Sequence, residues 1–337
     1  MQQNGVRFLS LDGIPTETPD RDGAVFFMRD PLGSWLPSKG NYLYEIDTAC
    51  VKIHDALASR VFGSADSFYA FLRAAPEFLM TAGMNSEAPV SKDQFVKLLE
   101  IVPSEIPAHQ GLYLFDCRRL VSAIQECSKE VMQLQGEFYQ VLNLEELFYP
   151  AIHEGDGVRY VTSPVVTKLF ALLGFVFIRL HSLLDYVTKL AFEIENLRSQ
   201  FGSYPKLASR HLLYGDKKKI RANNAKGSLF ESCPQLTEIE SVRNLLIHDG
   251  LLDDMPKAYK VIVAGECIEK FVLFPDRGKE GRLESFKNRT LFYGSEDKIN
   301  LRLPELLSEF QSRLMTTLEL LCRSLLESED KPTRTEG

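Results

Sequence analysis

Apolar side chains recur with a helical period along most of the chain, every three or four positions, and polar residues fill the intervening faces. The period is clear in six stretches: 44–63, 66–79, 92–101, 115–142, 165–199 and 303–326. A further helix starts at Leu229 or Pro234. The pattern therefore predicts a mainly α-helical fold.

The period breaks at both ends of this helical region. Residues 1–43 are rich in Gly, Pro and Asp, and the short runs "VRFLSL" and "AVFFMR" predict a hairpin or an extended arm. Two later runs, "AYKVIVAGECIEKFVLF" and "RLESFKNRTLFYG", flank the turn-like stretch "PDRGKEG", so we expect a β-hairpin at 258–293. We expect a smaller mixed α/β N-terminal region of unknown role at 1–110, a helical domain at 111–328 and a disordered tail at 329–337.

Composition narrows the class of protein. With 45% hydrophobic residues, the chain is globular. A protein whose whole surface binds nucleic acid would be basic, whereas this chain has a net charge of −7. The longest apolar run, 169–178, is about half the length that spans a bilayer, so we expect a buried helix and no membrane contact. The start of the chain resembles no secretion signal, which predicts a cytoplasmic protein. The six cysteines are scattered, and no motif for a metal or a cofactor is present, so we expect reduced thiols and neither ligand.

The stretch "SVRNLLIHDG" (241–250) places three polar side chains near the end of the helix that starts at 229 or 234. Its expected core positions are Ile239, Val242 and Leu246. Asn244 and His248 lie about 40° apart on another face, whereas Arg243 and His248 are nominally about 140° apart on an α-helix. Because the Arg side chain is long, all three could reach one phosphate.

Residue types alone leave two interpretations of this stretch open. An imidazole can transfer protons near neutral pH, and a guanidinium can hold a phosphate through paired donors, so the set suits RNA cleavage without metal. Alternatively, Arg243 forms an ion pair and His248 stabilises the helix C-terminus before Gly250.

"RNLLIH" resembles the R-x(4–6)-H signature of HEPN domains, here in the form Arg-Asn-x(3)-His. HEPN domains are all-α and associated with nucleic acid, and many are RNases of toxin–antitoxin, antiviral and RNA-processing systems. The stretch "IRLHSLLDYVTKLAFEIE" looks like the long helix that packs against the motif helix in this family. The resemblance thus implies a HEPN-like helical bundle over about 115–250, elaborated by the inserted hairpin.

The resemblance also implies a site and a reaction. Arg243, Asn244 and His248 would be the catalytic residues of a metal-independent endoribonuclease that cleaves RNA through 2′-OH attack. A polar stripe on the preceding helix includes Arg179, Ser182, Asp185 and Lys189; Asp185 or His181 would orient Arg243 or His248, with Arg179 in support. Alternatively, the stripe is a solvated edge or pairs within itself, as His181 and Asp185 can at their i, i+4 spacing.

Family members of this kind join two motif helices across a homodimer interface, and an antitoxin or regulatory protein is a further expected partner. The expected role is therefore that of a toxin or antiviral defence effector. Two other possibilities stay open: a non-catalytic HEPN-like module that binds RNA or a protein, and a helical scaffold with no nucleic-acid role.

The segment 201–230 separates charge from the rest of the chain. Seven cationic residues against one aspartate give it a net charge of +6, which leaves −13 elsewhere. We expect RNA contacts from seven of its residues: Lys206, Arg210, Tyr214, Lys217, Lys218, Lys219 and Arg221. Tyr204 and Tyr214 would stack on bases while the cations follow the phosphates. The alternative is a solvated loop with no specific partner.

Overall fold

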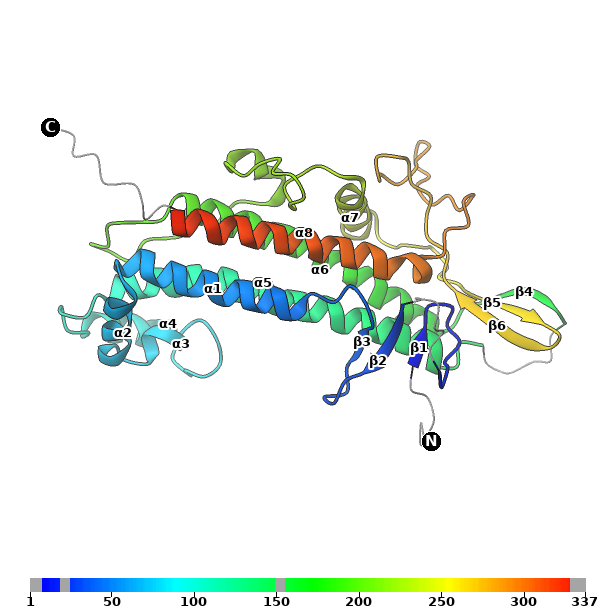
Figure 1. The fold of residues 1–337 in the computed structure, drawn as a ribbon, viewed down its shortest axis with the longest axis horizontal. Coiled ribbons are helices and arrows are strands. Elements are labelled where there is room, and N and C mark those ends of the chain that lie inside the picture. The colour runs from blue at the N-terminus through cyan, green and yellow to red at the C-terminus, as the bar shows by residue number, and fades with distance from the viewer. Residues whose placement is uncertain (1–7, 19–24, 149–154, 328–337) are drawn as a thin grey trace. The chain divides into compact units, whose positions relative to one another are not determined.

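The computed structural model describes residues 8–18, 25–148 and 155–327, and it is mainly α-helical, as the apolar pattern predicts (Figure 1). The α-helices are α1 (Leu43–Phe62), α2 (Ala65–Ala74), α3 (Phe78–Thr81), α4 (Lys92–Glu100), α5 (Ala108–Leu144), α6 (Pro164–Glu195), α7 (Pro234–Asn244) and α8 (Ile299–Glu327). A 3₁₀ turn at Tyr214–Lys219 and a π-helical turn at Leu245–Asp249 complete the helical elements of the described chain. The expected tail at 329–337 lies outside the described residues.

Two small antiparallel sheets accompany the helices. The first joins β1 (Phe8–Ser10), β2 (Phe26–Arg29) and β3 (Trp35–Pro37), so the two predicted N-terminal runs do pair, and a third strand extends them. The second joins β4 (Gly157–Val161), β5 (Ala258–Val263) and β6 (Glu266–Phe271).

The hairpin expected at 258–293 is wrong in its turn and its extent. The chain reverses at Ala264 and Gly265, inside the first predicted run, where both residues have positive φ angles of 52° and 79°. The Asp156 carboxylate accepts the backbone N–H groups of both residues, at 3.0 and 3.1 Å, and so holds the turn beside β4. The stretch 272–298 contains only isolated bridges. Its backbone bonds partly to other backbone groups, as Phe274 N does to the Asp297 carbonyl at 2.8 Å, and partly to side chains such as Asp276.

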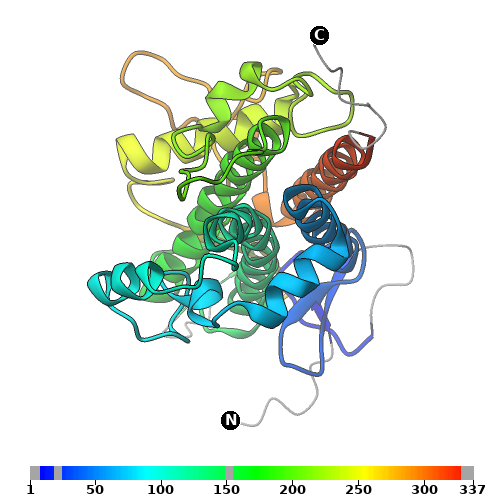
Figure 2. The ribbon, with the colours of Figure 1, turned by 90° about the vertical axis from the view of Figure 1, so that its left-hand side faces the viewer.

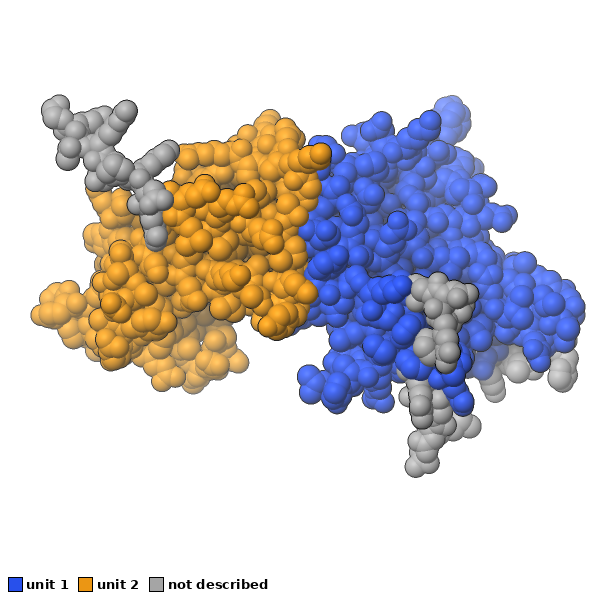
Figure 3. All heavy atoms as spheres, viewed as in Figure 1, with its two compact units in different colours: residues 1–43, 127–183, 231–314 blue, residues 44–126, 184–230, 315–337 orange. Residues whose placement is uncertain are grey.

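The chain forms two compact units, each assembled from three stretches of sequence (Figure 3). Unit 1 comprises residues 1–43, 127–183 and 231–314; unit 2 comprises 44–126, 184–230 and 315–337. Helices α5, α6 and α8 are each divided between the two units. The expected N-terminal region 1–110 is likewise divided between both.

Unit 2 is a helical bundle in which α1 runs beside the first part of α5 and the last part of α8 (Figure 2). Gln125 links α5 to α1 through its amide, which contacts His54 Nε2 at 3.3 Å and donates to Asp47 Oδ1 at 2.8 Å. The buried Glu193 of α6 accepts from the Tyr113 hydroxyl of α5 at 2.7 Å. Polar bonds between distant segments thus fix the register of these helices.

Unit 1 packs both sheets against the second part of α5, and the first part of α8 also contacts the second sheet. Asn143 of α5, buried, exchanges hydrogen bonds with the backbone of Ser10 in β1 at 3.0 and 3.1 Å. Asn300 of α8, also buried, donates to the Leu11 carbonyl at 2.6 Å and accepts from Val272 N at 3.0 Å. Two buried amides therefore attach the ends of both sheets to the helices.

Helix α6 is, within the described chain, the one helix that by length and composition is able to cross a membrane. The core helix of a soluble protein passes the same test, and 39% of the most apolar part of α6 is buried in the fold. The fold is compatible with a soluble protein.

A proline inside α8 leaves one backbone carbonyl of unit 1 without its helical hydrogen-bond donor. Pro304 has no N–H, so the carbonyl of Asn300, four residues earlier, loses its helical donor. The hydroxyl of the fully buried Tyr139 donates to that carbonyl. The tyrosine of α5 thus replaces the hydrogen bond that the proline removes.

We expect Tyr139→Phe to lower the free energy of unfolding by about 1–3 kcal/mol, because it leaves a buried carbonyl without a donor. In a Pro304→Ala background, where residue 304 again supplies an N–H, the same substitution should cost much less. Chemical denaturation of the four proteins of this cycle measures the difference, and equal costs in the two backgrounds would contradict the assignment.

Candidate functional site

Helix α7 carries the Arg-Asn-His stretch at its C-terminal end, in unit 1. Pro234 occupies the first turn, where its missing N–H costs nothing, and the buried residues Leu236, Ile239 and Val242 face the core. The helix then widens into the π-helical turn Leu245–Asp249, closed by the bond from Gly250 N to the Leu245 carbonyl at 2.9 Å. Gly250 has φ of 112° and ends the helix, as predicted. We call residues 243–249 the motif turn.

The π-helical geometry changes the angular relation expected for an α-helix. A turn closed by i→i+5 bonds holds more residues than an α-turn, so each residue rotates the chain by a smaller angle. The angle between the Arg243 and His248 side chains about the helix axis is therefore smaller than the value of about 140° expected for an α-helix. Such widened turns are frequent at functional sites.

The structure brings two of the three motif side chains together. Arg243 Nη1 donates to Asn244 Oδ1 at 3.0 Å, and this is the only side-chain hydrogen bond of Arg243 to the described residues. His248 and Asn244 are exposed, and the His248 imidazole has no hydrogen bond or ion pair within the described chain. Both ring nitrogens of His248 are therefore available to a ligand.

Helix α6 packs against the motif turn at a glycine. A Cβ placed on Gly174 would lie 3.4 Å from Leu246 Cδ2, so the absent side chain makes room for that leucine. Of the core positions expected for α7, Ile239 and Val242 are fully buried; Leu246 is half-buried, and its neighbour Leu245 is buried. The widened turn thus places both leucines against unit 1.

The three supporting residues on α6 have other partners than the motif turn. Arg179 forms an ion pair with Glu130 of α5 and lies over the Phe175 ring, with 5.8 Å to its centroid. Asp185, in unit 2, accepts from the backbone N of Tyr214 at 2.7 Å. His181 is half-buried in unit 1. Since Asn244 alone bonds the Arg243 side chain, none of the three orients that guanidinium.

Apolar side chains and carboxylates surround the motif turn. Phe175 of α6 and Ile247, Leu251 and Met255 around the turn are each at least 45% exposed. Asp249, Asp253 and Asp254 follow the histidine closely, and Asp253 lies 4.0 Å from Lys257. Arg243 is therefore the main cation of an otherwise acidic segment.

The basic segment 201–230, in unit 2, does not act as one surface. Tyr214 is 2% exposed and donates to the Leu229 carbonyl at 2.6 Å, so its ring cannot stack on a base, contrary to our expectation. The aromatic ring faces inward because Asp185 holds the Tyr214 backbone on α6.

Two of the three lysines of the 3₁₀ turn are bonded within the protein, and the third is exposed. Lys217 lies over the Tyr214 ring and donates to its hydroxyl at 2.9 Å, while Lys219 pairs with Asp216 at 2.7 Å and lowers the pKa of that carboxyl. Lys218 and Arg221 are exposed. Lys206 and Arg210 line a cavity of unit 2 together with Lys189 and Arg119.

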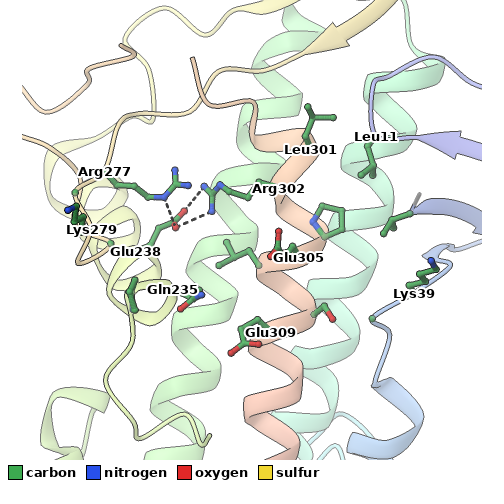
Figure 4. A pocket seen from close by; sticks show the side chains of 18 residues that line it. Leu11, Lys39, Gln235, Glu238, Arg277, Lys279, Leu301, Arg302, Glu305 and Glu309 are labelled. Atoms are coloured by element: carbon green, nitrogen blue, oxygen red, sulfur yellow. Dashed lines mark hydrogen bonds and ion pairs between the residues drawn. The ribbon is translucent and has the colours of Figure 1, made fainter. Parts of the chain in front are cut away.

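A buried charge network at the other end of α7 was missed by sequence reasoning (Figure 4). Glu238, 3% exposed, accepts from Arg302 Nη2 at 2.7 Å and Nη1 at 3.1 Å, and lies 3.1 Å from Arg277 Nε. Asp297 contacts both arginines, at 2.5 and 3.1 Å. A glutamate between the core positions Leu236 and Ile239 is the only signal in the sequence, and it does not identify partners 39 and 64 residues away.

This network lines one side of a cavity of about 640 Å³ in unit 1. The other charged side chains of its wall are Lys39, Lys279, Glu305 and Glu309, so both signs are present in similar number (Figure 4). Because its buried charges already neutralise one another, the cavity favours neither an anion nor a cation.

Within the described residues, no three His, Cys, Asp or Glu side chains are grouped so that they could hold a metal ion. The fold and the motif turn define a mainly α protein with an exposed Arg-Asn-His set at a widened helix end. Comparisons of the chain with protein-family models, with curated proteins and with solved structures found no match.

We expect Glu238→Gln to lower the free energy of unfolding by about 3 kcal/mol, because two partly buried arginines would then share one carboxylate. Urea denaturation measures this loss, and hydrogen exchange should rise at the amides of residues 245–250. Glu305→Gln is the matched control, since Glu305 lines the same cavity but is exposed; it should change stability by less than about 0.5 kcal/mol. An equal effect of both substitutions would contradict the role of the network.

Two helical glycines of unit 1 should respond oppositely to alanine. Gly174→Ala makes ordinary contact with Leu246 and should raise the free energy of unfolding by about 0.5–1 kcal/mol, because alanine favours the helix. Gly136→Ala in α5 would drive its Cβ into the Trp35 carbonyl oxygen of β3 and should lower it by about 1–3 kcal/mol. Thermal denaturation compares the two, and a stabilised Gly136→Ala variant would refute the close approach of β3.

Proposed function

We propose that the chain is a metal-independent endoribonuclease of HEPN type that acts as a toxin or antiviral defence effector. The observation that carries the proposal is the exposed motif turn: Arg243 and Asn244 are bonded to each other, and the His248 imidazole is available to a ligand. The packing of the long helix α6 against this turn at Gly174 is consistent with the HEPN arrangement that the sequence resembles.

Each motif residue would have a distinct role in RNA cleavage. His248 would take the proton from a ribose 2′-OH as its oxygen bonds to the adjacent phosphorus. The bond from phosphorus to the 5′-oxygen then breaks, and that oxygen leaves as a hydroxyl after it takes a proton from a protonated imidazole. Arg243 would stabilise the negative charge of the phosphorane, and Asn244, which accepts from Arg243, would hold the guanidinium in place. The products are a 2′,3′-cyclic phosphate and a 5′-hydroxyl end.

A homodimer would complete this site. One chain offers a single guanidinium and a single imidazole at the motif turn, whereas the reaction needs both a base and an acid and gains from a second cation. The exposed apolar side chains Phe175, Ile247, Leu251 and Met255 flank the turn and would lose their contact with water against a second copy.

The remaining parts of the proposal follow from the same assignment. RNA would be bound by exposed cations of segment 201–230, which include Lys206, Arg210, Lys218 and Arg221. We place the protein in the cytoplasm, and an antitoxin or another regulatory protein would restrain it until it is needed.

We expect His248→Ala to lower the rate of cleavage of single-stranded RNA at least about 100-fold, because it removes the proton-transfer group. The assay contains a chelator, and mass spectrometry checks the products for a 2′,3′-cyclic phosphate. Since His248 is exposed and bonded to no described side chain, the melting temperature should stay unchanged. Arg243→Lys, which keeps the charge but not the paired donors, should also be slow.

His109→Ala serves as the matched control, because His109 lies on α5 in unit 2, outside the motif turn. Cleavage that survives His248→Ala would contradict the assignment. Binding of RNA without cleavage by the unaltered protein would instead support a non-catalytic HEPN-like module.

A further inference from the structure

Unit 2 contains a cavity of about 580 Å³ that is separate in the sequence from the motif turn. Its walls come from α5, from the last part of α6 and from the segment 204–210. This volume lies within the range of about 300–1,000 Å³ that is typical of small-molecule sites. All the residues that line it belong to unit 2, so the cavity is complete in that unit.

Four cationic side chains face this cavity: Arg119, Lys189, Lys206 and Arg210. The last three form no side-chain hydrogen bond or ion pair with the described residues, and Arg119 reaches only the Met84 sulfur at 4.0 Å. This contrasts with Lys217 and Lys219 of the same segment, which have partners in the protein. Three cations without a carboxylate partner, beside Arg119, create a site for an anion.

Asp116 is the single carboxylate among the residues of the wall, where it faces four cations. Burial raises its pKa, while the hydroxyl of Tyr204, which donates to it, and the charge of Arg119 act in the other direction. With four cations and one carboxylate, the wall keeps a net positive charge even when Asp116 is ionised.

A buried hydroxyl in the same wall lacks a partner. Ser209 is fully buried, and its Oγ makes no hydrogen bond to the described residues, although its backbone N donates to Glu193 at 2.9 Å. Buried hydroxyl groups in folded proteins nearly always have a partner. Because Ser209 lines the cavity, its hydroxyl would donate a hydrogen bond to an oxygen of a bound anion.

Aromatic and apolar surface accompanies the cations. The rings of Tyr186 and Tyr204 line the cavity, and Tyr204 is 40% exposed. A second cavity of about 370 Å³ shares Tyr204, Asp116 and Arg119 with the first and is otherwise mainly apolar, with Phe95 and Phe115 in its wall. A flat heterocycle can stack on such rings while its charged part is held by the cations.

We propose that this cavity binds a nucleoside phosphate, with the phosphate among Arg119, Lys189, Lys206 and Arg210 and the base against the tyrosine rings. The nucleoside phosphate is either a free nucleotide or one residue of a single-stranded RNA. This inference rests on the RNA binding proposed above for Lys206 and Arg210, but not on cleavage at the motif turn, because all the residues of the cavity lie in unit 2.

The experiment uses the full chain with His248→Ala, so that any RNA remains intact, and measures binding by calorimetry. One arm titrates free nucleoside monophosphates and triphosphates, and the other titrates a short single-stranded oligoribonucleotide. Lys206→Glu with Arg210→Glu should weaken binding at least about tenfold, since it reverses two of the four cations. Lys97→Glu with Arg73→Glu is the matched control: it exchanges one Lys and one Arg, both exposed in unit 2 and outside the cavity, and should leave binding unchanged.

Ser209→Ala separates a ligand contact from a structural role. The hydroxyl makes no bond within the described chain, so its removal should weaken binding several-fold without lowering the melting temperature. Saturable binding in the first arm with this pattern of variants assigns a free nucleotide, and the same pattern in the second arm alone assigns an RNA residue. Binding in neither arm, or equal weakening by the control pair, would overturn the proposal.

Discussion

The burial of one carboxylate constrains the part of the protein that carries the Arg-Asn-His set. Glu238 is almost inaccessible to water, so its charge must be neutralised and its oxygens must accept hydrogen bonds from the protein. Arg302 and Arg277 do both, and Asp297 balances the second positive charge. A helix of 11 residues is too short to be stable alone in water, so α7 depends on these bonds to α8 and to the segment 272–298. The same bonds therefore help to fix the position of the motif turn at the other end of α7.

The same physical requirement, that buried polar groups have partners, explains how irregular stretches persist in unit 1. Asn143 and Asn300 bond the backbone of β1 and of the chain that leaves β6, and the Tyr139 hydroxyl replaces the N–H that Pro304 lacks. Asp276 accepts the backbone N–H groups of Gly294 and Ser295, at 2.6 and 2.9 Å. Unit 1 therefore contains long non-helical segments without a large sheet, because these side chains and scattered backbone bonds together satisfy their polar groups.

These contacts also mark the limit of what the sequence predicts. Apolar periodicity locates the helices, since a repeat of three and four residues reflects one buried face. It cannot reveal the π-helical turn, because Leu245 and Leu246 fit an α-helical pattern equally well. Nor does composition separate the basic residues of 201–230: the buried Tyr214 and the exposed Tyr204 look alike in sequence, and the partner of Asp185 is a backbone N–H 29 residues away. The candidate motif itself can be recognised in the sequence, because its three residues lie within six positions.

The histidine of the motif turn and the cations of the unit 2 cavity lie in different units of this chain. The motif turn offers an imidazole but only one nearby guanidinium, and three aspartates follow within six residues of His248. The cavity of unit 2 offers four cations but no histidine in its wall. A phosphodiester at the motif turn would therefore meet only one guanidinium of that turn in a single chain. A second Arg243 from a partner copy would correct this balance, and the exposed apolar residues around the turn would supply the burial that such a pairing requires.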